Sequence, residues 1–188
     1  DMKGHLAAFV TIFIWGTTFI STKVLLKSFS PIEILFIRFL IGYATLWLVY
    51  PHQLKPAEKK QELCFAAAGL CGVTLYYLME NMALTYTLAS NVGVIISIAP
   101  FFTAIFSFFL RKGDKPGKRF FLGFVMAMAG ICLISGSSGA ALSLNPLGDV
   151  LAIGAAIIWA VYSLLTRKIG DFGYHVVQAT RRTFFYGL

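Results

Sequence analysis

The chain reads Trp-Gly-Thr-Thr-Phe-Ile-Ser-Thr-Lys from Trp15 to Lys23, and 144 residues later it reads Trp-Ala-Val-Tyr-Ser-Leu-Leu-Thr-Arg from Trp159 to Arg167. Each stretch lies in a long hydrophobic segment. Four pairs of like residues keep this offset: Trp15 and Trp159, Thr22 and Thr166, Lys23 and Arg167, and Arg38 and Arg182. Trp and a terminal cation are common at the ends of membrane helices in general, but the shared offset favours an internal repeat.

The composition is that of a membrane protein. Of the 188 residues, 58% are hydrophobic and 13% are charged, whereas a soluble domain has about a quarter of its residues charged. The formal charge of +8 comes from cations in short loops between apolar runs. That distribution follows the positive-inside rule, so we expect lipid and no nucleic acid among the partners.

Six apolar runs are long enough for membrane helices, which need about 20 mainly apolar residues. They cover residues 6–26, 31–50, 63–84, 88–110, 119–135 and 147–165, and a seventh begins at residue 174. The sequence therefore predicts an all-α, polytopic helical bundle. Pro31 and Pro146 are predicted to stand at or near helix starts, where the missing N–H does no harm.

The cations predict the orientation of this bundle. Loops 51–62, 111–119 and 166–173 hold most of the Lys and Arg residues between the runs, while loops 85–88 and 136–146 hold none and the first loop holds only Lys27. Basic loops of membrane proteins face the cytoplasm. We therefore predict a multi-pass protein of the cytoplasmic (inner) membrane with a cytoplasmic N-terminus.

The repeat and the orientation together predict an inverted architecture. The first unit, residues 1–144, holds five helices, an odd number. The second unit, residues 145–188, must then enter from the opposite side, as in the inverted-topology repeats of many transporters. A complete pair of units would run to about 290 residues, so the sequence is expected to be a piece of a longer protein.

Several stretches resemble the drug/metabolite transporter superfamily, specifically the EamA-type permeases. They are Ile-Trp-Gly-Thr-Thr-Phe-Ile-Ser-Thr-Lys at 14–23, Glu-Asn-Met-Ala-Leu at 80–84, and the segments 31–42, 89–100, 123–130 and 148–168. The resemblance implies ten helices in two inverted five-helix units, of which about six and a half are present here. It also implies a central cavity that moves small organic solutes, with amino acids and other metabolites exported by many members.

Glu80 is the sharpest candidate residue, because a carboxylate inside an apolar helix is costly and is a functional hypothesis by default. It lies about 9 Å short of the helix end near Tyr86, and Arg38 lies at about 10 Å from the same surface. Two roles remain open for Glu80: a proton- or ion-coupling site, and a structural ion pair with Arg38. Lys23 is a further possible partner, although we expect it to extend to the outer interface.

Polar and aromatic residues share faces on three predicted helices. Tyr76, Tyr77 and Glu80 lie on one face, and Trp15 with Thr18 and Trp159 with Tyr162 form faces at equivalent repeat positions. We predict that the two equivalent faces line one cavity, with ordinary helix packing as the alternative. The candidate substrate-binding residues are Trp15, Thr18, Tyr76, Tyr77, Glu80, Asn81, Asn91, Ser97, Trp159 and Tyr162. The aromatic rings would suit an apolar side chain or an ammonium group.

Two further features concern helix packing and bending. Pro100 lies in the middle of the fourth run and predicts a kink there, which serves either as a gating hinge or as static curvature. The small residues at 154–156 predict a close helix–helix contact.

The sequence holds no phosphate-binding loop, no metal-ligand spacing and no nucleophile beside a base, so we predict neither an enzyme nor a cofactor. We predict a secondary transporter, most simply an exporter of small metabolites such as amino acids, working by alternating access. Two alternatives stay open: a non-transporting membrane scaffold or assembly partner, and a lipid-carrier flippase of the same superfamily.

Overall fold

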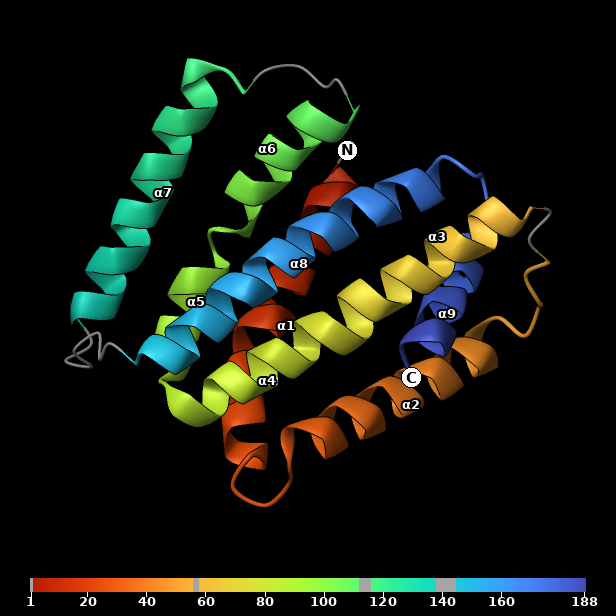
Figure 1. The fold of residues 1–188 in the computed structure, drawn as a ribbon, viewed down its shortest axis with the longest axis horizontal. Helices are drawn as coiled ribbons and strands as arrows, with labels where there is room; N and C mark the ends of the chain where they lie inside the picture. Colours follow the sequence, from red (N-terminus) through yellow and green to blue (C-terminus); the bar gives the residue numbers. More distant parts are fainter. Residues whose placement is uncertain (1, 56–57, 112–115, 138–144) are drawn as a thin grey trace.

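The computed structural model describes residues 2–55, 58–111, 116–137 and 145–188, and these residues form helices and no strand (Figure 1). The α-helices are α1 (Met2–Leu25), α2 (Pro31–Val49), α3 (Lys59–Gly69), α4 (Tyr76–Tyr86), α5 (Ala89–Ile96), α6 (Ala99–Arg111), α7 (Lys118–Ser137), α8 (Pro146–Gly170) and α9 (Val176–Gly187). A π-helical segment, η1 (Leu70–Leu75), joins α3 to α4 without a break. The predicted all-α bundle is confirmed.

Five spans in the described part of the chain are long and apolar enough to cross a membrane. Three are the single helices α1, α2 and α8; the fourth, Lys59–Tyr86, comprises α3, η1 and α4, and the fifth, Ala89–Phe109, comprises α5 and most of α6. The predicted run 119–135 is helical as α7, and its last side chains fall outside the described ones. The start of the seventh run forms α9.

The helices alternate in direction, so their ends gather at two ends of the bundle (Figure 1). The N-terminus and the start of α7 lie towards the top of the view, and the end of α2 and the starts of α3 and α9 lie at its right. The α1–α2 and α4–α5 connections lie at the lower left. We call the end at which α2 ends and α3 begins the basic end, because Lys55, Lys59 and Lys60 lie there.

Two helices begin where the sequence places a proline. At the start of α2, the Ser30 hydroxyl accepts from the Glu33 N–H at 3.3 Å, and the Glu33 carboxylate accepts from the Ser30 N–H at 2.7 Å. This is a capping box with Pro31 in the first turn. At the start of α8, the Asn145 side-chain oxygen accepts from the Gly148 N–H at 3.2 Å.

The helix α8 crosses the middle of the bundle and packs against α3, α4, α5 and α6 (Figure 1). Its packed face is built from small, fully buried residues: Ala152, Ala155, Ala156 and Ala160. A Cβ on Gly154 would lie only 2.2 Å from Cε of Met79, so α4 and α8 approach more closely than larger side chains would allow. The predicted packing role of residues 154–156 is confirmed.

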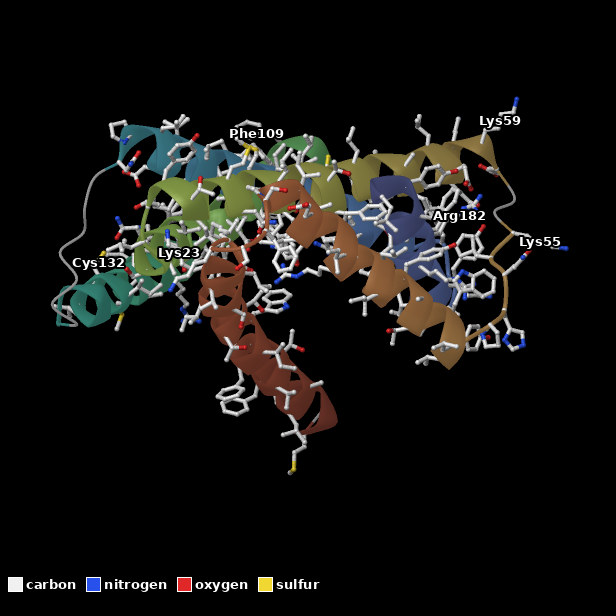
Figure 2. The ribbon with its side chains drawn as sticks, turned by 90° about the horizontal axis from the view of Figure 1, so that it is seen from below. Lys23, Lys55, Lys59, Phe109, Cys132 and Arg182 are labelled. Atoms are coloured by element: carbon white, nitrogen blue, oxygen red, sulfur yellow. The ribbon has the colours of Figure 1, made fainter. Side chains whose placement is uncertain are left out.

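The helix α1 behaves differently, since most of its side chains are exposed. It leans away from the other helices (Figure 2), and only the half that begins at Trp15 contacts the bundle. Most of its exposed side chains are apolar and suit the hydrocarbon of a membrane. Only the residues of α1 from Trp15 onward can therefore contribute to a site within the bundle.

Candidate substrate site between α1, α4 and α8

The π-helical segment η1 comes directly before the residues of the candidate site. It forms where two helices press against the third span: a Cβ on Gly72 would lie 2.2 Å from Cδ2 of Tyr162, and one on Gly69 would lie 2.5 Å from the Thr183 carbonyl oxygen. Thr74 also donates from Oγ1 to the Gly187 carbonyl at 2.6 Å. A π turn often marks a functional segment. Here it sets the direction in which Tyr76 and Tyr77 leave the helix.

The structure brings the predicted aromatic residues together. The Trp159 ring contacts the rings of Trp15, Tyr76 and Tyr162, with centroid distances of 5.6, 4.7 and 5.2 Å. The Tyr76 ring contacts that of Tyr77 at 4.8 Å. We call these five residues the aromatic cluster. The two predicted faces, on α1 and α8, are therefore in direct contact through their aromatic rings. In this conformation the rings fill the space between the two faces.

Glu80 lies one helical turn after Tyr76 and is only 2% exposed. The Tyr76 hydroxyl and the Arg38 guanidinium both lie close enough to act on the charge of its carboxylate. Arg38 also donates from Nη2 to Oγ1 of Thr22 at 3.2 Å and lies over the Tyr77 ring at 5.3 Å. Arg38 thus joins α1, α2 and α4 at the level of Glu80, and the direct ion pair of Arg38 with Glu80 stays a prediction.

Lys23 has a role that the sequence analysis missed. Its ammonium donates to the carbonyl oxygens of Leu84 and Thr87, the latter at 2.8 Å, and so caps the C-terminal end of α4. Asn145 donates to the Tyr86 carbonyl at 2.8 Å in the same turn. Lys23 thus reaches the end of α4, the end that the sequence analysis assigns to the outer interface, and Arg38 is the cation near Glu80.

The two candidate amides link helix ends. Asn81 is fully buried and donates from Nδ2 to the Pro31 carbonyl at 3.0 Å, which ties α4 to the start of α2. Asn91 donates from Nδ2 to Oγ1 of Thr87 at 3.2 Å, at the turn between α4 and α5. In this conformation both contacts stabilise the connections between helices. A role of either amide in substrate binding stays a prediction.

The candidate hydroxyls are bonded within their own helices. Thr18 and Ser97 each donate to the carbonyl four residues earlier, at 3.0 and 2.7 Å. Beyond Ser97 the fourth predicted helix is interrupted, because α5 ends at Ile96 and α6 begins at Ala99. Pro100 has no N–H to offer the Ile96 carbonyl, so the predicted bend lies in the expected place.

At the basic end, Arg182 of α9 binds Glu62 in the first turn of α3, with Nε 2.8 Å from Oε1. The Tyr186 hydroxyl donates to the same carboxylate oxygen. The repeat offset paired Arg182 with Arg38, but it did not identify the residue that Arg182 binds. The sequence signal that could have identified this partner is Glu62 itself, because it is a carboxylate that closely follows Lys59 and Lys60 at a basic helix start.

The comparison with known proteins adds the family. The EamA-like transporter family matches residues 2–136. The chain belongs to this family. It is 33% identical to an uncharacterized transporter of Archaeoglobus fulgidus over 90% of this chain and 59% of that protein. It is 29% identical to the uncharacterized inner membrane transporter YedA of Escherichia coli K12, over 87% of this chain and 53% of that protein.

The chain thus spans between half and two thirds of the length of these relatives. The uncharacterized transporter YvbV of Bacillus subtilis shows the same pattern, with 28% identity over 88% of this chain and 54% of that protein. No solved structure matches the chain. The family and the apolar spans together establish a multi-pass membrane protein of a transporter family, as the resemblance implied.

Proposed function

We propose that this chain provides the first unit, residues 1–144, and the start of the second unit, residues 145–188, of a secondary transporter. The transporter moves small metabolites such as amino acids out of the cell by alternating access between two inverted units. Its basic end faces the cytoplasm. Membership of the EamA-like family supports transport as the activity.

One observation carries the proposal: Trp15 and Trp159, which are equivalent by the repeat offset, touch each other. When two units are related by a twofold axis, equivalent residues can touch only at that axis. Substrate sites of inverted-repeat transporters lie at the interface of the units near the membrane midplane. The contact therefore supports a site in the aromatic cluster, where α1 of one unit meets α8 of the other.

The chemistry of the cluster fits a small substrate with a positive charge or an apolar side chain. The rings offer cation–π faces, and the buried Glu80 carboxylate offers a place for a proton or a cation. Because the Trp15 and Trp159 rings occupy the gap between the units, a substrate can bind only when the units move apart there. Protonation of Glu80 would remove one negative charge beside Arg38 and so change the balance between conformations.

Transport by the full-length protein in proteoliposomes tests the proposal. We expect uptake of a radiolabelled amino-acid mixture driven by an imposed proton or cation gradient, and we expect Glu80→Gln to abolish this coupled uptake while the protein still inserts. Glu33→Gln is the matched control, because glutamine also serves the capping box of α2. Coupled uptake at the normal rate in Glu80→Gln would remove Glu80 from the mechanism. A wild-type protein without flux would favour a scaffold, and selective movement of lipid carriers a flippase.

A further inference from the structure

A cavity of about 220 Å³ lies at the basic end, between α2, the loop that follows it and α9. Its walls include Tyr43 and Trp47 of α2 and Arg181, Arg182 and Phe185 of α9. It shares no lining residue with the aromatic cluster. The proposed transport site therefore leaves this cavity unexplained.

Arg181 gives the cavity a fixed positive charge. The side chain is only 4% exposed. Its guanidinium donates to the carbonyl oxygens of Tyr50, at 2.6 Å, and of His52, and it stacks on the Trp47 ring at 3.8 Å from the centroid. Carbonyls and a ring orient this cation but carry no net charge, so the described residues around Arg181 hold it without neutralising it.

Arg182 adds a second guanidinium, which is partly exposed and binds only one carboxylate oxygen. Its partner Glu62 binds it through one carboxylate oxygen, and the two side chains are 33% and 25% exposed. Arg182, on α9, lies between α2 and α3, whereas Lys55 and Lys59 point away from the bundle (Figure 2). Two arginines and one glutamate leave an excess of one positive charge at the cavity.

The rest of the cavity wall is aromatic. The rings of Tyr43 and Phe185 lie 6.5 Å apart, across the gap between α2 and α9. Tyr43 stands two helical turns before Tyr50, and so about 10 Å deeper in the bundle than the loop. The cavity thus has a cationic part near the loop and an aromatic part towards the interior, a pattern that complements an anionic group attached to a hydrocarbon chain.

We propose that this cavity binds the phosphate head group of an anionic phospholipid from the leaflet that faces the basic loops. Arginine binds phosphate through paired N–H groups, and basic pockets between membrane helices are suited to anionic head groups. The acyl chains of the lipid lie along Tyr43 and Phe185. A lipid in this position joins α2 of the first unit to α9 of the second, so it strengthens their contact at the basic end.

Native mass spectrometry of the full-length protein tests the site. The detergent-solubilised protein is titrated with phosphatidylglycerol, phosphatidylcholine, glycerol phosphate and inorganic phosphate. We expect tight retention of one phosphatidylglycerol, with phosphatidylcholine at least tenfold weaker. Equal binding of the two lipids would overturn the proposal. Binding of glycerol phosphate as tight as that of phosphatidylglycerol would also overturn it and would identify a site for soluble phosphate esters.

Three variants separate binding from structural effects. Arg182→Gln should weaken phosphatidylglycerol binding about tenfold, the effect of one charge-assisted hydrogen bond. Glu62→Gln should strengthen it severalfold, because Arg182 is then released to the phosphate, whereas a purely structural ion pair would give no gain. Lys59→Gln, which removes an outward-pointing cation at the same end, should leave the affinity unchanged. Equal losses in Arg182→Gln and Lys59→Gln would show general surface attraction and would contradict the site.

One more variant keeps the test decisive if Arg182→Gln fails to fold. Arg181→Lys retains the charge but loses the planar pair of N–H groups that a phosphate prefers. We expect it to weaken phosphatidylglycerol binding while the mobility of the protein on size exclusion stays normal. Unchanged binding in a folded Arg181→Lys protein would overturn the role given to Arg181.

Discussion

Trp15 and Trp159 meet edge to face, with ring centroids 5.6 Å apart and ring planes at 87°, although 144 residues separate them in the sequence. Trp15 is 50% exposed, at the start of the half of α1 that contacts the bundle. Trp159 lies in the centre of α8 and contacts Tyr76 on its other side. The rings of Trp159 and Tyr76 therefore connect Trp15 of α1 to the neighbourhood of the buried Glu80 carboxylate.

A double-mutant cycle on this pair should show coupling. Trp15→Ala and Trp159→Ala should each lower the melting temperature, and the double variant should lose less than the sum, by an interaction of about 1 kcal/mol. Trp47→Ala combined with Trp15→Ala is the control, because Trp47 contacts Arg181 rather than α1 or α8. Strict additivity of the Trp15 and Trp159 effects in thermal unfolding would contradict the contact.

Lys23 should stabilise the end of α4. Lys23→Met removes the ammonium that binds the Leu84 and Thr87 carbonyls, and a cation at a helix C-terminus contributes about 0.3–2 kcal/mol. We expect a melting temperature several degrees below that of the wild type. Lys27→Met, which removes an exposed cation one turn further on, should change it little. A smaller loss in Lys23→Met than in Lys27→Met would exclude the capping role.

The sequence predicted the helices well, because the apolar runs and the prolines are local signals. Pro31 and Pro146 start α2 and α8, and Pro100 lies just beyond the interruption between α5 and α6. The repeat offset also pairs Trp15 with Trp159, which are in contact in the structure. The helix starts and the interruption depend on the order of residues along one segment, and the repeat depends on the likeness of two segments, so the sequence states both directly.

The parts that the sequence did not predict depend on the geometry between segments. The sequence placed Lys23 towards the outer interface, but only the position of the α4 end shows that its ammonium binds carbonyls there. Glu62 became the partner of Arg182 because α9 packs on α3. The π turn arises where Tyr162 and the end of α9 press on Gly69 and Gly72. Each of these contacts joins residues of different helices, which a reading of one segment at a time does not bring together.

Gly72 should tolerate no side chain. A Cβ there would lie 2.2 Å from Cδ2 of Tyr162, and either α8 or the π turn would have to move. We expect Gly72→Ala to reduce the yield of folded protein sharply and Tyr162→Ala to restore much of it in the double variant. Gly93→Ala is the control, since open space surrounds that position, and it should leave the yield unchanged or raise stability by up to about 1 kcal/mol. Equal yields of Gly72→Ala and Gly93→Ala would refute the close approach.

The interruption between α5 and α6 should act as a hinge. Pro100→Ala supplies an N–H to the Ile96 carbonyl and removes the ring that disturbs the preceding turn, a change of up to about 3 kcal/mol in favour of continuous helix. We therefore expect a higher melting temperature together with slower transport, because the fourth span then bends less easily when the two units move.

Pro146→Ala is the matched control for this experiment. Pro146 stands in the first turn of α8, where no helical partner for an N–H exists, so its replacement should affect transport little. Both variants are compared in thermal unfolding and in proteoliposome uptake of the same amino-acid mixture. A Pro100→Ala protein that is more stable and transports at the wild-type rate would show that the bend is static curvature. A stable protein that transports slowly, beside a normal Pro146→Ala, would place the moving joint at residues 97–98.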